Sequence, residues 1–121
     1  MCIRDSYVTV TGKGGHAALP ENTVDPILIA SSLVINLQQI VSRKAPPSIP
    51  TVLSFGKINS EGGATNIIPD VVKLEGTFRT FDEKWRKKAH KLIKKMAEQM
   101  AKAMGGSCDF DIVKGLSLIH I

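Results

Sequence analysis

Two helical stretches of different character divide this sequence, and each opens with an aspartate suited to a helix N-terminus. Asp25 offers a side-chain acceptor for free backbone N–H groups, and Pro26 has a backbone angle suited to the first helical position. From there to Ser42 the chain carries apolar residues at helical spacing and almost no charge. A helix with apolar residues on all its faces is buried on more than one side. We therefore expect other parts of the structure to cover this helix on more than one side.

The second helical stretch opens at Asp82, and Gly105 with Gly106 ends it. One apolar stripe runs along it, with members three or four residues apart: Trp85, Ala89, Leu92, Met96, Met100 and Met104. Lysines fill the other faces, and we expect His90 to lie in solvent among them. Residues 82–102 hold eight basic and three acidic residues, which accounts for the whole net charge of +5. Such a stretch can bind nucleic acid or a membrane surface, but we favour a solvated helix face.

Four further stretches have the composition or the alternation of strands. They are residues 7–11, 51–58, 71–81 and 109–113. The resulting order, β-α-β-β-α-β, is that of the split βαβ or ferredoxin-like arrangement. We therefore predict an α+β fold, with one four-stranded antiparallel sheet and two helices on one of its faces.

The composition is that of an ordinary globular domain. The chain has 121 residues, of which 43% are hydrophobic and 22% charged, and these values argue against disorder. No apolar run approaches the roughly 20 residues of a membrane helix, and no secretory signal is visible, so our default location is cytoplasmic. Cys2 and Cys108 have no metal-ligand spacing, and two free thiols in a reducing compartment explain them best.

The two ends of the chain fit neither strand pattern. Residues 1–6 and 116–121 resemble translated sequencing-adapter sequence. We expect residues 7–115 to form the native domain and the natural protein to be longer at both ends. For this reason Cys2 and His120 carry no weight in the functional interpretation.

Three polar residues stand out from the pattern of core and turns. His16 follows a strand within a glycine-rich segment, where a side chain can be offered to a partner, although a turn histidine in water is the simpler alternative. Asn66 lies in a loop, and asparagines commonly shape loops through their own backbone. Arg79 lies on the wetter face of a strand, where it can bind a carboxylate with two hydrogen bonds or pair with Glu75.

The sequence contains no complete catalytic apparatus. The histidines at positions 16, 90 and 120 are widely separated, and no cluster of the three or four ligands of a catalytic metal is present. There is also no nucleophile elbow and no phosphate-binding loop. We therefore predict that the chain alone binds no catalytic metal.

Three motifs occur together and in order, and together they resemble one family. They are Gly-x-Gly-Gly-His-Ala-Ala-x-Pro followed by Val-Asp-Pro-Ile, then Gly-Ala-Thr-Asn-Ile-Ile-Pro-Asp, then Glu-Gly-Thr-Phe-Arg-Thr-Phe. This combination is similar to the dimerisation, or lid, domain of the aminoacylase/carboxypeptidase superfamily of zinc metallopeptidases. Its branch of hippurate hydrolases, N-acyl-amino-acid amidohydrolases and auxin-conjugate hydrolases is the most similar. The resemblance covers residues 7–115, and the lid of that family has the same order of elements.

The resemblance implies a role for each of the three polar residues. In that family the lid is inserted into a catalytic domain that holds one or two zinc ions, and it completes the active site, often that of the other subunit. His16 would stabilise the oxyanion of the tetrahedral intermediate, Asn66 would contact the substrate near the scissile amide, and Arg79 would hold the substrate carboxylate.

The resemblance also implies what this chain lacks. The zinc ligands and the general-base glutamate of the family map onto no part of it. It implies a fragment of a homodimeric amidohydrolase that is inactive alone, with zinc or another divalent metal in the missing domain.

The expected topology indicates a dimer surface. The second strand lies at a sheet edge, and its residues 51–56 carry no charge, so this edge can pair with another chain. Together with the neighbouring uncharged first helix, it can join two copies about a twofold axis.

Two other functions are compatible with the same fold. An RNA-recognition motif has the same order of elements, but it needs aromatic residues on the open sheet face, where only Tyr7 or Phe81 could serve because Phe78 is expected in the core. The Arg/Lys-Gly-Phe-x-Phe signature is also absent. A free-standing ferredoxin-like domain that dimerises or binds a ligand is the other alternative, and the three polar residues together favour the enzyme lid.

Overall fold

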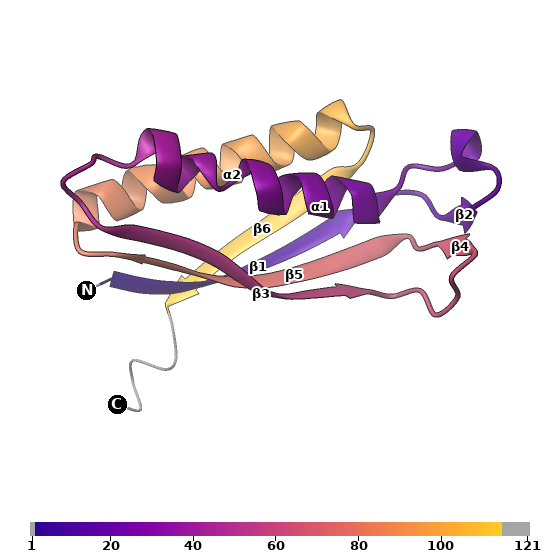
Figure 1. Cartoon of the computed structure of the whole chain (residues 1–121), viewed down its shortest axis with the longest axis horizontal. Coiled ribbons are helices and arrows are strands. Elements are labelled where there is room, and N and C mark those ends of the chain that lie inside the picture. The colour runs from indigo at the N-terminus through magenta and orange to yellow at the C-terminus, as the bar shows by residue number, and fades with distance from the viewer. Residues whose placement is uncertain (1, 115–121) are drawn as a thin grey trace.

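The computed structural model describes residues 2–114, which form a two-layer α+β fold. One layer is a four-stranded antiparallel sheet in the order β3-β5-β1-β6, and both helices lie on the same face of it (Figure 1). The strands are β1 Cys2–Thr11, β3 Thr51–Ser60, β5 Val71–Thr80 and β6 Ser107–Lys114, and the helices are α1 Pro26–Asn36 and α2 Glu83–Ala103. The predicted ferredoxin-like fold is confirmed, and β3 lies at a sheet edge as expected.

Shorter elements connect these six. A second, two-stranded sheet consists of β2 Gly15–His16 and β4 Ile67–Ile68, and it lies beyond one end of the main sheet (Figure 1). A 3₁₀ turn covers Pro20–Asn22, and a π-helical turn covers Ile40–Lys44. No helix in the described part of the chain is long and apolar enough to cross a membrane.

The first strand is longer than the sequence pattern predicts. It begins at Cys2, and it pairs with β5 over its whole length and with β6 from Arg4 onwards. Ile3 and Ser6 are buried in this arrangement. The prediction that the N-terminal six residues fit no strand was wrong for Cys2–Ser6, because pairing on both sides, and not local alternation, makes this segment a strand.

The assignment of the two ends as non-native tails stays a prediction. The fold shows where Cys2–Ser6 lie but not where they come from. The expected tail at residues 116–121 lies outside the described residues.

Both helices begin at the aspartates that the sequence indicated. The Oδ1 atom of Asp25 accepts hydrogen bonds from the backbone N–H groups of Ile27 at 2.9 Å and Leu28 at 3.3 Å. The Oδ1 atom of Asp82 accepts one from Trp85 at 2.9 Å. Each carboxylate therefore satisfies N–H groups that the helix itself leaves free.

The first helix is shorter than predicted, because it ends at Asn36 and not near Ser42. The side-chain amide of Gln38 donates to the carbonyl of Val34 at 3.3 Å, while its backbone N–H donates to Ile35 at 3.3 Å. The backbone N–H of Gln38 therefore bonds to the residue three positions before it, and not to the fourth as in an α-helix. The regular helix is thus interrupted before the π-helical turn.

The buried row of α2 differs from the predicted stripe. It consists of Trp85, Ala89, Ile93, Ala97 and Ala101, each four residues from the next. Of the expected members, Leu92, Met96, Met100 and Met104 are only partly buried at the flanks of the core. The small alanines let the helix axis approach the sheet closely, so the row with the smallest side chains faces the strands and the long methionines lie beside it.

Side chains of the main sheet alternate between the helix-covered face and an open face. Val8, Leu74 and Phe78 are buried under the helices. Tyr7 and Arg79 are exposed on the other face. The burial of Phe78 confirms that this ring belongs to the core and cannot stack on bases, so an RNA-binding face would have to rely on Tyr7 or Phe81.

Candidate functional site

Two of the three polar residues lie side by side at one corner of the molecule. His16 is in β2, and its partner in the register of β4 is Ile67. The following amide, that of Ala17, donates to the backbone carbonyl of Asn66 at 2.9 Å. His16 and Asn66 are both exposed. We call the segments around β2 and β4, residues 12–17 and 66–70, the β2–β4 corner.

Glycines allow the backbone segments of this corner to approach each other. A Cβ atom at Gly12 would lie 2.2 Å from the carbonyl oxygen of Val24, and one at Gly14 would lie 2.4 Å from that of Ile68. Any larger residue at these positions would push the segments apart. The close packing of the backbone therefore explains why glycines precede His16, independently of any role in catalysis.

The imidazole of His16 has a defined proton position. Its Nδ1 atom accepts a hydrogen bond from the backbone N–H of Ala18 at 3.0 Å. Because a backbone N–H can only donate, Nδ1 carries no proton in this contact, and the neutral ring carries its proton on Nε2. The exposed edge of the ring is thus a hydrogen-bond donor.

Arg79 lies far from this corner. It is near the end of β5, opposite Ile3 on one side and Val52 on the other, whereas β4 precedes the start of β5. Between Val71 and Arg79 the strand alone extends for about 26 Å at about 3.3 Å per residue. The structure brings His16 and Asn66 together within one chain and leaves Arg79 at the opposite end of the sheet (Figure 1).

The alternative interpretation of Arg79 as the ion-pair partner of Glu75 is wrong. Glu75 pairs with Lys57 on the neighbouring strand, with Oε2 and Nζ 3.6 Å apart. Within residues 2–114 Arg79 makes no ion pair, and its side chain is exposed on the open face of the sheet. The guanidinium is therefore available to an anion from outside the chain.

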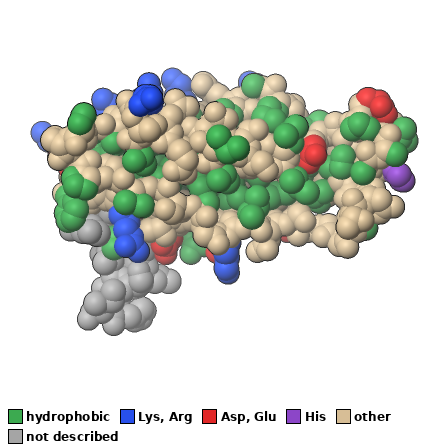
Figure 2. Space-filling view, viewed as in Figure 1, with side chains coloured by type: hydrophobic (Ala, Val, Ile, Leu, Met, Phe, Trp, Pro, Cys, Tyr) green, Lys and Arg blue, Asp and Glu red, His purple; other side chains and the backbone are tan. Residues whose placement is uncertain are grey.

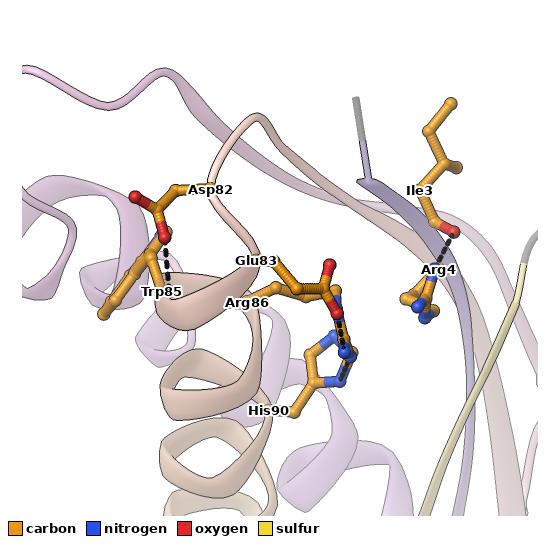
Figure 3. Close-up of polar contacts among 7 residues, drawn as sticks. All are labelled: Ile3, Arg4, Asp82, Glu83, Trp85, Arg86 and His90. Carbon is orange, nitrogen blue, oxygen red and sulfur yellow. Dashed lines mark hydrogen bonds and ion pairs between the residues drawn. The ribbon is translucent and has the colours of Figure 1, made fainter.

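His90 is not in solvent as predicted, but half-buried between α2 and the sheet. Its ring meets that of Phe78 edge-on with centroids 5.3 Å apart, and Arg86 Nη1 lies 3.2 Å from Nδ1. Arg86 also donates from Nε to Glu83 at 2.8 Å, and Figure 3 shows Arg86 between the two side chains. Burial, with Arg86 and Arg4 as further causes, lowers the pKa of His90 to about 4.

This histidine is a neutral packing residue and no candidate for catalysis. The lysines around it in the sequence led to the prediction that it lies in solvent. Its position one residue after buried Ala89 places it instead at the edge of the buried row. The sequence signal that could have found it is the helical position itself, since residues next to a buried row are commonly half-covered.

An apolar groove runs between α1 and the edge strand β3. It is lined by Ser31, Val34 and Ile35 from the helix and by Phe55, Gly56, Lys57 and Ile58 from the strand. Leu28, Ile35 and Ile58 are exposed to 59%, 71% and 53%. Figure 2 shows hydrophobic side chains gathered along α1 and along its junction with the sheet. In a single chain, then, α1 is covered on one side only.

The described residues offer no metal site. Within residues 2–114 no three His, Cys, Asp or Glu side chains come together in a group that could hold a metal ion. Cys108 is a free cysteine whose pKa is raised to about 12, first by burial and then by Glu98 and Asp109. Its thiol is thus protonated at neutral pH and is a poor ligand and nucleophile.

A family model named peptidase dimerisation domain matches residues 4–105. This chain belongs to the peptidase dimerisation domain family. The match covers both segments of the β2–β4 corner and also Arg79. It confirms the resemblance that the three sequence motifs carried.

Other members of this family are similar to the chain over most of its length. An N-acetyl-L-cysteine deacetylase of Bacillus subtilis is 48% identical over 97 residues, which are 79% of this chain and 23% of the relative. A hippurate hydrolase of Campylobacter jejuni is 41% identical over 104 residues, 85% of this chain and 27% of the relative. This dimerisation domain thus spans about a quarter of the length of these curated relatives.

A solved structure shows the same fold. The crystal structure of a putative aminohydrolase from methicillin-resistant Staphylococcus aureus superposes with a TM-score of 0.87 at 29% sequence identity. The match covers 93% of this chain and 30% of that chain. The two-layer arrangement is therefore that of a segment within a larger hydrolase-like chain.

Proposed function

We propose that this chain is the dimerisation domain of a metal-dependent amidohydrolase that hydrolyses N-acyl amino acids or similar amides. The observation that carries the proposal is the β2–β4 corner, where two distant motifs present His16 and Asn66 together. The names of the relatives support this reaction class, since they include a deacetylase of N-acetyl-L-cysteine and a hippurate hydrolase.

His16 is the proposed catalytic residue of this domain. Amide hydrolysis develops negative charge on the former carbonyl oxygen, and a fixed donor aimed at that oxygen lowers the barrier by about 3 kcal/mol. The Nε2–H of His16 is such a donor, because the Nδ1 side of the ring is held by Ala18. Asn66, next to it, would contact the substrate beside the scissile amide with either end of its side-chain amide.

Arg79 is the proposed anchor for the substrate carboxylate. Its planar guanidinium matches a carboxylate with two parallel hydrogen bonds, and it is exposed. A small acyl amino acid is much shorter than the roughly 26 Å between Val71 and Arg79 along β5. Arg79 would therefore serve a different active site from the one that His16 of the same subunit serves. In a homodimer, each active site would then take its histidine from one subunit and its arginine from the other.

The proposed dimer interface consists of β3 and α1. Leu28, Ile35 and Ile58 expose apolar surface around the groove between these elements. The edge of β3 between Thr51 and Phe55 is free of charged side chains and has one neighbouring strand only. Two copies related by a twofold axis would cover α1 on its second side, as its apolar sequence requires.

A catalytic zinc, or another divalent metal, belongs to the proposal as a part of the enzyme outside this chain. The described residues do not supply a ligand set for it. Besides dimerisation, the proposed role of this domain is to bind and orient the substrate and to donate a hydrogen bond from His16.

The complete reading frame that contains this chain provides the test. The encoded enzyme is expected to hydrolyse N-acyl amino acids, and His16→Ala is expected to lower kcat by about 100- to 1000-fold with a much smaller change in KM. His90→Gln changes the other described histidine and is expected to retain activity. A full-length protein that hydrolyses no amide, or one that keeps full activity with His16→Ala, would show the proposal to be wrong.

A further inference from the structure

One carboxylate at the β2–β4 corner, that of Asp70, binds the backbone just before His16. The Oδ1 atom of Asp70 accepts a hydrogen bond from the N–H of Gly14 at 2.7 Å. The backbone carbonyl of the same residue accepts one from Gly12 at 2.8 Å. Asp70 is exposed, so its charge could remain fully hydrated, yet it holds the glycine-rich segment at two points.

Backbone hydrogen bonds also hold the segment that carries His16: the N–H of Lys13 donates to Val24 at 2.8 Å, and the N–H of Ala17 donates to Asn66 at 2.9 Å. The ladder between β2 and β4 contains two residue pairs, Gly15 with Ile68 and His16 with Ile67. A ladder this short is marginal in water, and glycines lose more backbone entropy on ordering than other residues. A hydrogen bond to an ionised carboxylate is about twice as strong as a neutral one. The hydrogen bond from Gly14 to Asp70 therefore adds a charge-assisted restraint between Lys13 and this short ladder.

Asp70 is itself well anchored. It directly precedes Val71, the first residue of the central strand β5, and it follows Pro69, which is buried. A Cβ atom at Gly14 would lie 2.9 Å from Oδ1 of Asp70, so the contact requires glycine at that position. The carboxylate thus connects the His16 segment to the start of β5.

We propose that Asp70 is a positioning residue for His16. Its carboxylate binds the Gly14 amide and fixes the backbone that sets the direction of the imidazole, so that the Nε2–H donor faces outwards. This inference rests on the proposed function for the meaning of His16, but the ordering of the segment by Asp70 is a property of this chain alone.

The test compares Asp70→Ala and Asp70→Asn in the full 121-residue chain by nuclear magnetic resonance. Asp70→Ala is expected to raise the hydrogen-exchange rate of the Gly14 amide about tenfold or more and to shift the ring nitrogens of His16 towards a mixture of tautomers. Asp70→Asn keeps an acceptor oxygen and is expected to restore most of both signals. Asp111→Ala removes an exposed aspartate on β6, far from the corner, and is the matched control.

If Asp70→Ala does not fold, Asp70→Ser provides the same test, because its hydroxyl is too short to reach Gly14. Unchanged Gly14 exchange and an unchanged His16 tautomer in the folded variants would overturn the proposal. Equal changes in Asp111→Ala would also overturn it.

A second readout separates positioning of His16 from a general loss of structure. In the complete enzyme Asp70→Ala is expected to lower kcat about tenfold or more, with little change in KM. If Asp70 acts through His16, adding Asp70→Ala to His16→Ala lowers kcat no further; a full additional loss would overturn the positioning role. An inactive wild-type enzyme would contradict the proposed function, while the ordering of Gly14 would still be measured.

Discussion

The indole N–H of Trp85 on α2 donates to the hydroxyl of Thr51 on β3 across 3.0 Å. The same hydroxyl donates to the carbonyl of Ile49 at 3.1 Å. This chain of two hydrogen bonds joins the start of the second helix to the start of the edge strand. Trp85 is only 5% exposed, so the contact also fixes a large buried side chain.

Replacing Trp85 with Phe is expected to destabilise the fold by about 1–2 kcal/mol, because the Thr51 hydroxyl loses its donor in a partly buried place. The free energy of unfolding from urea titration measures the change. In a Thr51→Val background the same substitution should cost distinctly less. An equal cost in both backgrounds would show that packing and not the hydrogen bond is lost.

The stability of the fold is expected to fall as the pH is lowered from about 6.5 to about 4. The pKa of His90 is about 4 in the folded chain and 6.5 in a free histidine. Since the unfolded chain binds the proton first as the pH falls, protonation favours unfolding across this window. Arg86, Arg4 and Glu83 are the charged groups that act on the ring.

Urea unfolding at pH 7 and at pH 4.5 measures this effect. His90→Leu is expected to flatten the pH dependence. An unaltered slope in His90→Leu would mean that other groups cause the loss at low pH.

Dimerisation is expected to depend on the apolar surface of α1. Ile35 is 71% exposed in the single chain, and Ile35→Asp would bury a charge in the proposed interface, which is costly without a partner. We expect the dissociation constant to rise at least about tenfold, measured by sedimentation equilibrium. Val113→Asp, on the opposite edge strand, is the matched control, and equal weakening by both variants would contradict the assignment of the interface.

Mixed dimers are expected to recover activity that neither parent has. When a His16→Ala subunit pairs with an Arg79→Ala subunit, one of the two active sites would retain both residues if each site draws on two subunits. The complete enzyme, with the two variants coexpressed under separate tags, is assayed after purification on both tags. Activity near half that of the wild type is the expected result. Dimers as inactive as the two parents would mean that one subunit supplies both residues to a site.

Removal of residues 1–6 is expected to weaken the fold. Cys2–Ser6 pair with the end of β5, and Ile3 is buried among them. Loss of this apolar side chain alone costs about 2 kcal/mol, and thermal unfolding followed by circular dichroism gives the change. Removal of residues 116–121 is the comparison. Because the predicted domain ends at residue 115, this second truncation is expected to leave the stability unchanged. A fold that is equally stable without residues 1–6 would support the domain limits of 7–115.

The sequence predicted those helix starts and strands that depend on neighbouring residues along the chain. The caps at Asp25 and Asp82 and the alternation along β5 are read from neighbouring residues, and the structure confirms them. The first half of β1 has no such local pattern, because Arg4 and Asp5 interrupt it. Its strand conformation comes from β5 and β6 on its two sides, and pairing of that kind is tertiary.

The candidate site was predictable in its members but not in its arrangement. His16 and Asn66 are distant in sequence and adjacent in the fold, while Asn66 and Arg79 are close in sequence and far apart in the fold. An extended strand between the latter two produces the separation, and its direction cannot be read from a motif. The hydrogen bond from Gly14 to Asp70 was also invisible, since it depends on how two loops meet.

The two edge strands of the sheet, β3 and β6, differ in how readily they can pair with a further strand. Near Gly56 a bulge shifts the register of β3, and Lys57 follows it, so a straight, uncharged stretch exists only before the bulge. At the other edge, β6 carries Asp109 and Asp111 in exposed positions, which repel a second strand of the same kind. A molecule with one receptive edge can form a closed pair but not an endless ribbon. In the proposed dimer each β3 edge would be covered by the other copy, and the charged β6 edges that remain would disfavour growth into a fibre.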